Sequence, residues 1–293
     1  MSKDHEMATL GVGVEITDRT IGIGKVARLT SERGYSSIFV SEHTHVPVDS
    51  RSVSPTGVPR DWVKRMPDPY VTLAAAAATT DLEVGTSVAL LAEHEPVVLA
   101  KAIATLDQLS GGRFVLGVGW GWHREEFENI THKSPHERVA MLIENLAAMR
   151  RLWTDEEAEY IGKYVQIRKS WSWPKPARPG GPPVLLGAPG TTRNFQRIVA
   201  WADGWIPQMS GLDSEVFPAQ LDALRRLWRE AGRAASGPDI TVFHPPGSAD
   251  DVRRGLERAS QLGIKRVLVR IIEERMKDFE AIVDAVAPAI PGR

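Results

Sequence analysis

Short apolar runs alternate with longer amphipathic segments along almost the whole chain. The short runs are apolar at consecutive positions, as in strands buried on both faces of a parallel sheet, and the longer segments have the period of helices. Eight strands, each followed by a helix, favour a closed parallel (β/α)8 TIM barrel over an open doubly wound sheet. The predicted strands cover 10–14, 37–40, 82–88, 114–118, 184–187, 204–206, 240–243 and 266–270.

Capping and turn residues mark several helix boundaries. Asp68-Pro69 is typical of an N-cap followed by the first helical position. The segment 134–137 has the Ser and Glu spacing of a capping box. Ser110-Gly111-Gly112 indicates a helix C-cap, because glycine adopts the left-handed conformation without steric cost. The predicted helices cover 21–33, 69 onward, 95–109, 134–153, 191–202, 215–231, 249–262 and 277–287.

Two segments, 44–67 and 155–183, interrupt the alternation within what we predict to be a single domain spanning 1–293. The first follows a strand directly, so we expect it at the C-terminal mouth, where barrel active sites lie. A lid and a loose insertion both agree with its composition. The second contains a possible short strand at 160–167 and a region rich in Trp and Pro. We expect it too at the mouth, with Trp171 and Trp173 covering the pocket.

Composition narrows the function classes. The 293 residues carry a net charge of −1, so the chain has no general attraction to nucleic acid or to an anionic membrane. There is no cysteine, which excludes disulfides and a cysteine nucleophile. No apolar run approaches the roughly 20 residues of a membrane span, and Met1 to Met7 lack the apolar core of a secretory signal. We therefore expect a cytoplasmic protein.

Candidate chemistry lies at the predicted strand ends, because catalytic groups of such barrels project from there. Gly117, Gly119 and Gly121 alternate after the fourth strand, which suits either a flat ligand against the backbone or a loop with unusual dihedral angles. The strand-end residues are Ser41 to His43, Ser87 and Val88, Gly119 to His123, Gly187 to Gly190, Pro207 to Ser210, His244 and Arg270.

His43 is the best acid–base candidate, since an imidazole titrates near neutral pH and this one leaves a strand before a long loop. His43 and His45 also resemble the paired histidines that bind metal in some barrels. Such a site needs further ligands from other strand ends, and apart from Glu42 and His244 few are available. We therefore predict no metal.

The turn Gly187-Ala188-Pro189-Gly190 precedes a helix that begins at Thr191. Backbone N–H groups at a helix N-terminus can bind phosphate, but an ordinary strand-to-helix turn has the same composition. A dinucleotide fingerprint is unsupported, because no third glycine follows Gly117 and Gly119 at the required spacing. Several tryptophans could line a ring-binding pocket or simply pack in the core, namely Trp62, Trp120, Trp122, Trp171, Trp173 and Trp205.

Several motifs, in this order and spacing, resemble the luciferase-like monooxygenase superfamily, and within it the oxidoreductases that use the deazaflavin coenzyme F420. The resemblance covers nearly the whole chain. The motifs are Ser41-Glu42-His43, Gly85-Thr86-Ser87-Val88, the stretches 96–101 and 105–113, Gly117-Val118-Gly119, Pro182 to Gly187 and Ala202-Asp203-Gly204-Trp205.

The resemblance implies a (β/α)8 barrel with His43 near the reactive carbon of the deazaflavin, and a non-proline cis peptide at Ser87-Val88 behind the ring. It places the cofactor phosphate near the turn 187–190. We predict His43 and Glu42 as catalytic residues. The predicted cofactor-binding residues are Ser41, His43, Thr86, Ser87, Val88, Gly119, Trp120, Gly187, Ala188, Pro189 and Gly190.

One departure bears on the substrate. Some sugar-phosphate dehydrogenases of this group have a catalytic glutamate just after the fourth-strand glycines, where this chain has Trp122. We therefore expect a more apolar ketone, alcohol or enone. The predicted function is hydride transfer between C5 of F420 and a small organic molecule, by a homodimer. The alternatives are an FMN-dependent monooxygenase, a non-catalytic flavin- or deazaflavin-binding relative and a metal-dependent barrel hydrolase.

Overall fold

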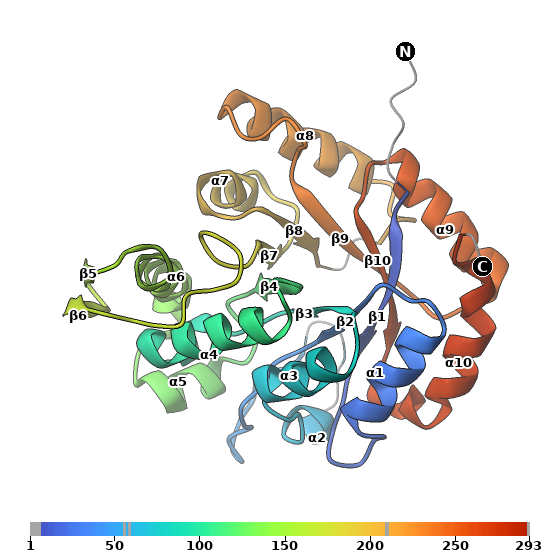
Figure 1. The fold of residues 1–293 in the computed structure, drawn as a ribbon, viewed down its shortest axis with the longest axis horizontal. Helices are drawn as coiled ribbons and strands as arrows, with labels where there is room; N and C mark the ends of the chain where they lie inside the picture. Colours follow the sequence, from blue (N-terminus) through green and yellow to red (C-terminus); the bar gives the residue numbers. More distant parts are fainter. Residues whose placement is uncertain (1–6, 55–56, 58–59, 209–210, 292–293) are drawn as a thin grey trace.

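Eight parallel strands close into a barrel that helices surround (Figure 1). The computed structural model describes residues 7–54, 57, 60–208 and 211–291. Around the barrel the strands follow the order β1-β10-β9-β8-β7-β4-β3-β2. They are β1 (Thr9–Val14), β2 (Ser37–Val40), β3 (Glu83–Thr86), β4 (Phe114–Val118), β7 (Val184–Ala188), β8 (Gly204–Pro207), β9 (Asp239–His244) and β10 (Arg266–Ile271).

The predicted strand–helix alternation, and with it the (β/α)8 barrel, is confirmed. Among the described residues, no helix is long and apolar enough to cross a membrane. The α-helices are α1 (Ile23–Glu32), α2 (Arg60–Val63), α3 (Pro69–Thr79), α4 (Pro96–Leu109), α5 (Arg124–Thr131), α6 (Arg138–Thr154), α7 (Thr192–Trp201), α8 (Phe217–Glu230), α9 (Ala249–Gln261) and α10 (Phe279–Val286); 3-10 turns are η1 (Leu91–Glu93), η2 (Pro135–Glu137), η3 (Glu273–Asp278) and η4 (Ala287–Ala289).

Local signals placed some boundaries correctly and others wrongly. Asp68 caps α3 by accepting a hydrogen bond from the N–H of Val71 at 2.8 Å. After α4, Gly111 and Gly112 have φ of 62° and 80°, as the C-cap prediction requires. The capping box at 134–137 is wrong, because Ser134 accepts from the N–H of His136 and opens only a 3-10 turn. The Glu137 carboxylate instead accepts from Lys163 and Tyr164.

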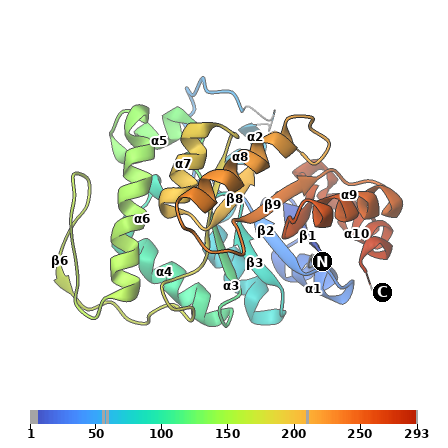
Figure 2. The same ribbon diagram turned by 90° about the horizontal axis from the view of Figure 1, so that it is seen from above.

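The segment 155–183 differs from both expectations made for it. In place of one short strand it forms an antiparallel hairpin, β5 (Ala158–Ile161) with β6 (Gln166–Ser170). It joins the end of α6 to the start of β7, so it leaves from the N-terminal end of the barrel and not from the mouth. Figure 2 shows the hairpin outside α6. Trp171 and Trp173 are exposed there, so they do not cover the mouth.

The barrel interior is built in layers. The central layer is apolar and consists of Phe39, Val115, Leu185, Ile206 and Leu268. Bulky side chains fill it because nearby strands carry glycines: a Cβ on Gly85, which pairs with Phe39 on the adjacent strand, would collide with the Phe39 ring, and a Cβ on Gly13 would collide with the ring of Phe243. The centre is therefore packed solid, and chemistry is confined to the barrel ends.

The layer at the N-terminal end is charged and enclosed. The Arg266 side chain is 1% exposed and donates to both Glu83 oxygens, to Asp239 and to Thr241 Oγ1. Burial alone would lower the pKa of Arg266, but its carboxylate partners raise it above the usual value. Arg266 therefore stays charged. Its hydrogen bonds link β10 to β3 and β9 and close this end of the barrel.

Candidate functional site

A buried carboxylate holds the imidazole of His43 at the C-terminal mouth. His43 leaves β2 directly, and its Nδ1 lies 2.6 Å from Oε2 of Glu126. Glu126 lies in the first turn of α5, and its side chain is fully buried. Figure 2 shows α5 at the same end of the barrel as the segment that follows β2. Residues 83 positions apart in the chain thus form one acid–base pair.

The protonation of this pair follows from its hydrogen bonds. Burial would raise the pKa of Glu126, but the hydrogen bonds from His43 and the Thr44 N–H, together with the nearby imidazoles, lower it below the usual value. Glu126 is therefore an acceptor, and Nδ1 of His43 must carry the proton it donates. That tautomer leaves Nε2 of His43 as the atom that can accept or deliver a proton.

A second histidine supports Glu126 from behind. Nδ1 of His123 lies 3.3 Å from the same Oε2, and its Nε2 lies 2.5 Å from Oγ of Ser50. Burial lowers the pKa of His123 despite the carboxylate beside it, so the ring is neutral near pH 7. The Trp122 ring packs edge-on against His43 at 5.4 Å between centroids. These contacts fix the orientation of the His43 ring.

Hydrogen bonds from backbone N–H groups attach the first part of the 44–67 segment to the start of α5. The N–H of Thr44 donates to Oε1 of Glu126 at 2.6 Å. The N–H groups of Arg51 and Ser52 both donate to Oε1 of Glu125, at 2.8 and 3.1 Å. Carboxylates in the first turn of a helix suit its dipole. The described residues 44–54 are therefore an anchored wall; residues 55, 56, 58 and 59 lie outside the described part of the chain.

Glu42 has a different environment from His43. Its side chain is 1% exposed, with one oxygen accepting from the Leu90 N–H at 2.6 Å and the other 2.6 Å from Nε2 of His94. Burial would lower the pKa of His94, but the hydrogen bond and charge of Glu42 raise it. Both Glu42 oxygens thus hold the turn 90–94 in place behind the mouth.

Gly119, just after β4, and Gly187, within β7, make room for Val88. The peptide bond Ser87-Val88 is cis, as the resemblance predicts. A Cβ on Gly119 or on Gly187 would lie within 3.0 Å of a Val88 methyl group. Close approach by Val88 therefore explains these two glycines, whereas Gly121, with φ of 69°, needs the left-handed conformation. Val88 forms an apolar platform flanked by strand ends without bulky side chains.

The other predicted cofactor residues lie around this platform. Ser41 donates from Oγ to the carbonyl of Ser87 at 3.1 Å, and Thr86 donates to the carbonyl of Gly117 at 2.7 Å. These hydroxyls hold the ends of β2, β3 and β4 together. Their hydrogen bonds to carbonyls position the backbone under the platform.

The turn 187–190 leads into α7, whose N-cap Thr191 accepts from the Asn194 N–H. Arg197 lies one turn further along and stacks over the Trp120 ring, 5.6 Å from its centroid. Burial and the nearby Arg193 lower the pKa of Arg197. A helix N-terminus with two arginines beside it suits an anionic group. At the neighbouring strand end, Met209 and Ser210 lie outside the described residues.

The tryptophans fall into separate environments. Trp205 is fully buried between Phe195 and Phe217 and donates to the carbonyl of Ala188 at 2.8 Å, so it belongs to the core. Trp62 is buried as well, whereas Trp120 and Trp122 are half-buried at the mouth. Of the tryptophans that we predicted for the pocket, Trp120 and Trp122 in the loop after β4 are therefore the partly accessible ones at the mouth.

Within the described part of the chain, ligand atoms of His43, His123 and Glu126 lie within 4.8 Å of one another, close enough to hold a metal ion. His45 is not part of this group and contacts Thr44 and Asn129. A cation would have to displace the protons that the imidazoles share with Glu126. Because hydrogen bonds already satisfy the cluster, the absence of a metal stays our prediction.

Glu93 lies behind the site as a neutral acid. It is 7% exposed, and Oε2 has no hydrogen-bond partner among the residues that the structure describes. Burial, with the charges of Glu126 and Glu42, raises its pKa from 4.5 to about 9. Near pH 7 the group is protonated, which leaves Glu126 as the carboxylate facing His43.

We expect Glu93→Gln to stabilise the fold at pH 8 but not at pH 4. Below pH 4.5, Glu93 is protonated in both the folded and the unfolded chain. Between pH 4.5 and about 9, Glu93 ionises in the unfolded chain but stays protonated in the folded one. The free energy of unfolding of the wild type therefore falls as the pH rises towards 9. The advantage of the variant grows by at most about 1.4 kcal/mol per pH unit. Urea unfolding at both pH values measures it, with exposed Glu128→Gln as control. A constant difference would contradict the assignment.

Sequence reasoning missed Glu126 and Glu93, and it placed His123 among the strand-end residues without giving it a role. Helix α5 was not predicted, because its eight residues contain one buried apolar side chain, Phe127, and no repeating apolar period. The available signal was the acidic pair Glu125-Glu126, which begins two residues after His123 and is typical of a first helical turn.

Comparison with known proteins gives one family and several relatives. The luciferase-like monooxygenase family matches residues 13–278. The chain is 41% identical over 283 residues to the uncharacterized protein Rv0953c of Mycobacterium tuberculosis, covering 94% of this chain and 96% of that protein. It is 32% identical over 243 residues to the F420-dependent glucose-6-phosphate dehydrogenase of Nakamurella multipartita, covering 82% and 66%.

Solved structures share the fold at lower identity. Monooxygenase RslO1 from Streptomyces bottropensis has a TM-score of 0.78 at 19% identity, covering 95% of this chain and 97% of that one. An F420-dependent secondary alcohol dehydrogenase in complex with an F420-acetone adduct has a TM-score of 0.73 at 17% identity, covering 96% and 99%.

Proposed function

Because the chain belongs to the luciferase-like monooxygenase family of enzymes, we propose that it is an F420-dependent oxidoreductase that transfers a hydride between the cofactor and a small organic substrate. The observation that carries the proposal is the His43–Glu126 pair at the mouth, which holds a proton-transfer group with Nε2 available. The relative at 32% identity, an F420-dependent dehydrogenase, supports the choice of cofactor.

The residues at the mouth fit a deazaflavin. Val88, packed over Gly119 and Gly187, offers an apolar surface for one face of the ring. The N-terminus of α7, with Arg193 and Arg197, suits the anionic tail. When bound, F420 supplies the ring carbon that gives or takes the hydride.

His43 handles the proton that accompanies the hydride. In alcohol oxidation, Nε2 accepts the hydroxyl proton; in carbonyl reduction, it returns a proton to the oxygen. Glu126 accepts from Nδ1 in both directions and stabilises the ring when it is positively charged. Trp122 and the wall at residues 44–54 limit the access of water. We assign Glu42 a positioning role, since both of its oxygens bind the turn 90–94.

A turnover assay tests this function. Oxidised F420 is incubated with a panel of secondary alcohols, and reduced F420 with ketones and enones, while the deazaflavin absorbance is followed. We expect at least one substrate to be converted. Binding of F420 without any conversion would favour a non-catalytic relative, and oxygen consumption with reduced FMN would favour a monooxygenase. Hydrolytic activity that is lost on chelation of metal would favour the hydrolase alternative.

We also propose that the protein is a homodimer and that the outer faces of α3 and α4 meet a second copy. Helix α3 has no charged residue, and Val71, Ala75 and Ala78 are exposed on it. The adjacent α4 exposes Val98, 69% accessible. The patch of Val71, Ala75, Ala78 and Val98 is apolar, although Lys101 is exposed beside it on α4, and an apolar patch suits a two-fold copy of itself. The cytoplasmic location stays a prediction.

Light scattering with size-exclusion chromatography tests the dimer. We expect twice the chain mass for the wild type and a single chain for the double variant Val71→Glu/Val98→Glu, because the charges would be buried without partners. Arg229→Glu on the exposed surface of α8 is the matched control. A wild-type monomer, or a double variant that stays dimeric, would contradict the assignment.

A further inference from the structure

Glu15 is a buried carboxylate at the mouth that the mechanism above does not use. On β1, Gly11 and Gly13 face the barrel interior, because a Cβ on either would collide with interior side chains. Strand pairing continues to Glu15, whose N–H donates to the carbonyl of Ile271 at 3.1 Å. Since strand side chains alternate, Glu15 also faces inward, above the apolar layer.

Arg270 donates a hydrogen bond to one of the two oxygens of the Glu15 carboxylate. Arg270 lies opposite Gly13 on the neighbouring strand β10, and its Nη2 donates to Oε1 of Glu15 at 2.9 Å. The Glu15 side chain is 7% exposed, and its Oε2 is buried with no hydrogen-bond partner among the described residues. An unpaired buried carboxylate oxygen costs free energy. Arg270 is 35% exposed, so it has donors left for a ligand.

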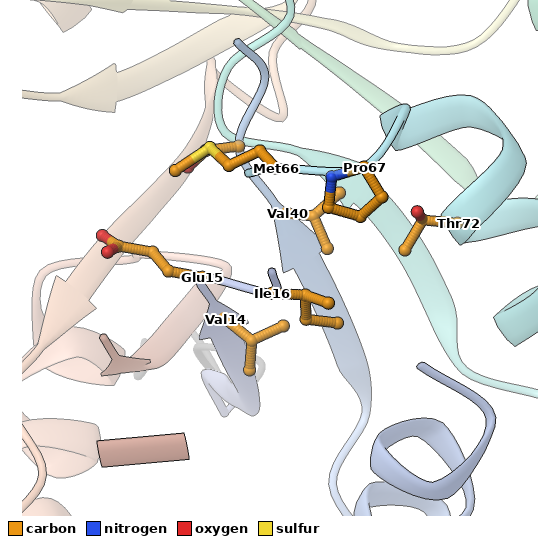
Figure 3. Close-up of a pocket in the computed structure, with 8 residues that line it drawn as sticks. Val14, Glu15, Ile16, Val40, Met66, Pro67 and Thr72 are labelled. Carbon is orange, nitrogen blue, oxygen red and sulfur yellow. The ribbon is translucent and has the colours of Figure 1, made fainter. Parts of the chain in front are cut away.

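The surroundings of the pair provide apolar contacts. Glu15 lines a small cavity together with Val40, Ser41, Met66 and Pro67. In Figure 3 the carboxylate points away from Val14 and Ile16, its neighbours in sequence. With a volume of about 10 Å³, the cavity has room for about one water molecule, so a ligand group must reach Oε2 from the mouth.

We propose that Glu15 and Arg270 bind a second hydroxyl group of a neutral alcohol substrate, distinct from the hydroxyl whose proton His43 accepts. This inference rests on the proposed function and names its substrate class. The hydroxyl donates to Oε2 of Glu15 and accepts from Arg270. The two charges neutralise each other, so an anion meets repulsion from Glu15 and an ammonium group meets repulsion from Arg270. A hydroxyl satisfies both partners without adding a charge.

Paired fragments test the site without requiring turnover. Binding of 1,4-cyclohexanediol and of its monomethyl ether is measured by ligand-observed NMR, with and without F420, so that both fragments keep one hydroxyl for His43. We expect the wild type to prefer the diol about tenfold, as for one hydrogen bond to a charged group. Glu15→Met removes the acceptor and should abolish the preference, and Glu15→Gln, which keeps the shape, should reduce it. The control is Glu273→Gln, since this carboxylate already accepts from Thr17.

The outcomes separate this inference from the proposed function. Equal binding of the diol and its monomethyl ether by the wild type, or a preference that survives in Glu15→Met, would overturn the hydroxyl site even where F420 binds. A Glu15-dependent preference with no binding of F420 would support the site while the proposed function fails. Each variant is also titrated with F420, and we expect the cofactor affinity to change by less than about twofold.

Discussion

His43→Ala is expected to lower kcat by about 10²- to 10⁴-fold, the usual contribution of general acid–base catalysis. Affinity for F420 should change far less, because the platform at Val88 and the N-terminus of α7 are untouched. Steady-state kinetics with the best substrate and a fluorescence titration of the cofactor measure the two effects. Equal losses of turnover and cofactor affinity would contradict the catalytic assignment.

A double-mutant cycle tests the role of Glu126. Alone, Glu126→Gln should lower kcat by tenfold or more at unchanged cofactor affinity. The amide lacks the negative charge with which the Glu126 carboxylate keeps the proton on Nδ1 of His43. Combined with His43→Ala it should add little, since groups that act as a unit are not additive. His45→Ala, a nearby histidine that contacts Asn129, is the control and should stay within about twofold. Additive losses would contradict the pair.

Arg266→Met is expected to destabilise the fold by about 3 kcal/mol, because it leaves Glu83 and Asp239 without their shared partner at the closed end of the barrel. Urea unfolding measures the loss. Adding Glu83→Gln should recover part of it, because the repulsion between the two acids disappears. That recovery separates a charge effect from lost packing.

Lys265 provides the matched control for this prediction. It is adjacent in sequence and also pairs with Asp239, at 3.0 Å, but its side chain is 57% exposed. Water and salt screen such a pair, so Lys265→Met should cost less than about 1 kcal/mol. A loss below about 1 kcal/mol for Arg266→Met as well would show that the interior ion cluster does not stabilise the barrel.

The barrel could be predicted from the sequence because its signals are local. Each buried strand is an apolar run, and boundary residues such as Asp68 and the 110–112 turn act within a few positions. His43 was found for the same reason, since its position after a strand places it at the mouth. The hairpin 158–170 was missed because its turn lies within a stretch that has the composition of a single short strand.

The partners of the site residues could not be predicted, because they depend on contacts distant in sequence. Glu126 lies 83 positions from His43, and Arg270 lies 255 positions from Glu15. Charged residues are usually at the surface, so sequence alone gives no sign that Arg266 or Glu93 is buried. Only closure of the barrel brings these groups together.

Cofactor binding tests the central claim most directly. Purified protein is titrated separately with oxidised F420 and with FMN, and the ligand fluorescence is followed. We predict tight, saturable binding of F420 with little affinity for FMN. Binding of FMN alone would contradict the deazaflavin assignment and favour a monooxygenase, and binding of neither would contradict the redox function altogether.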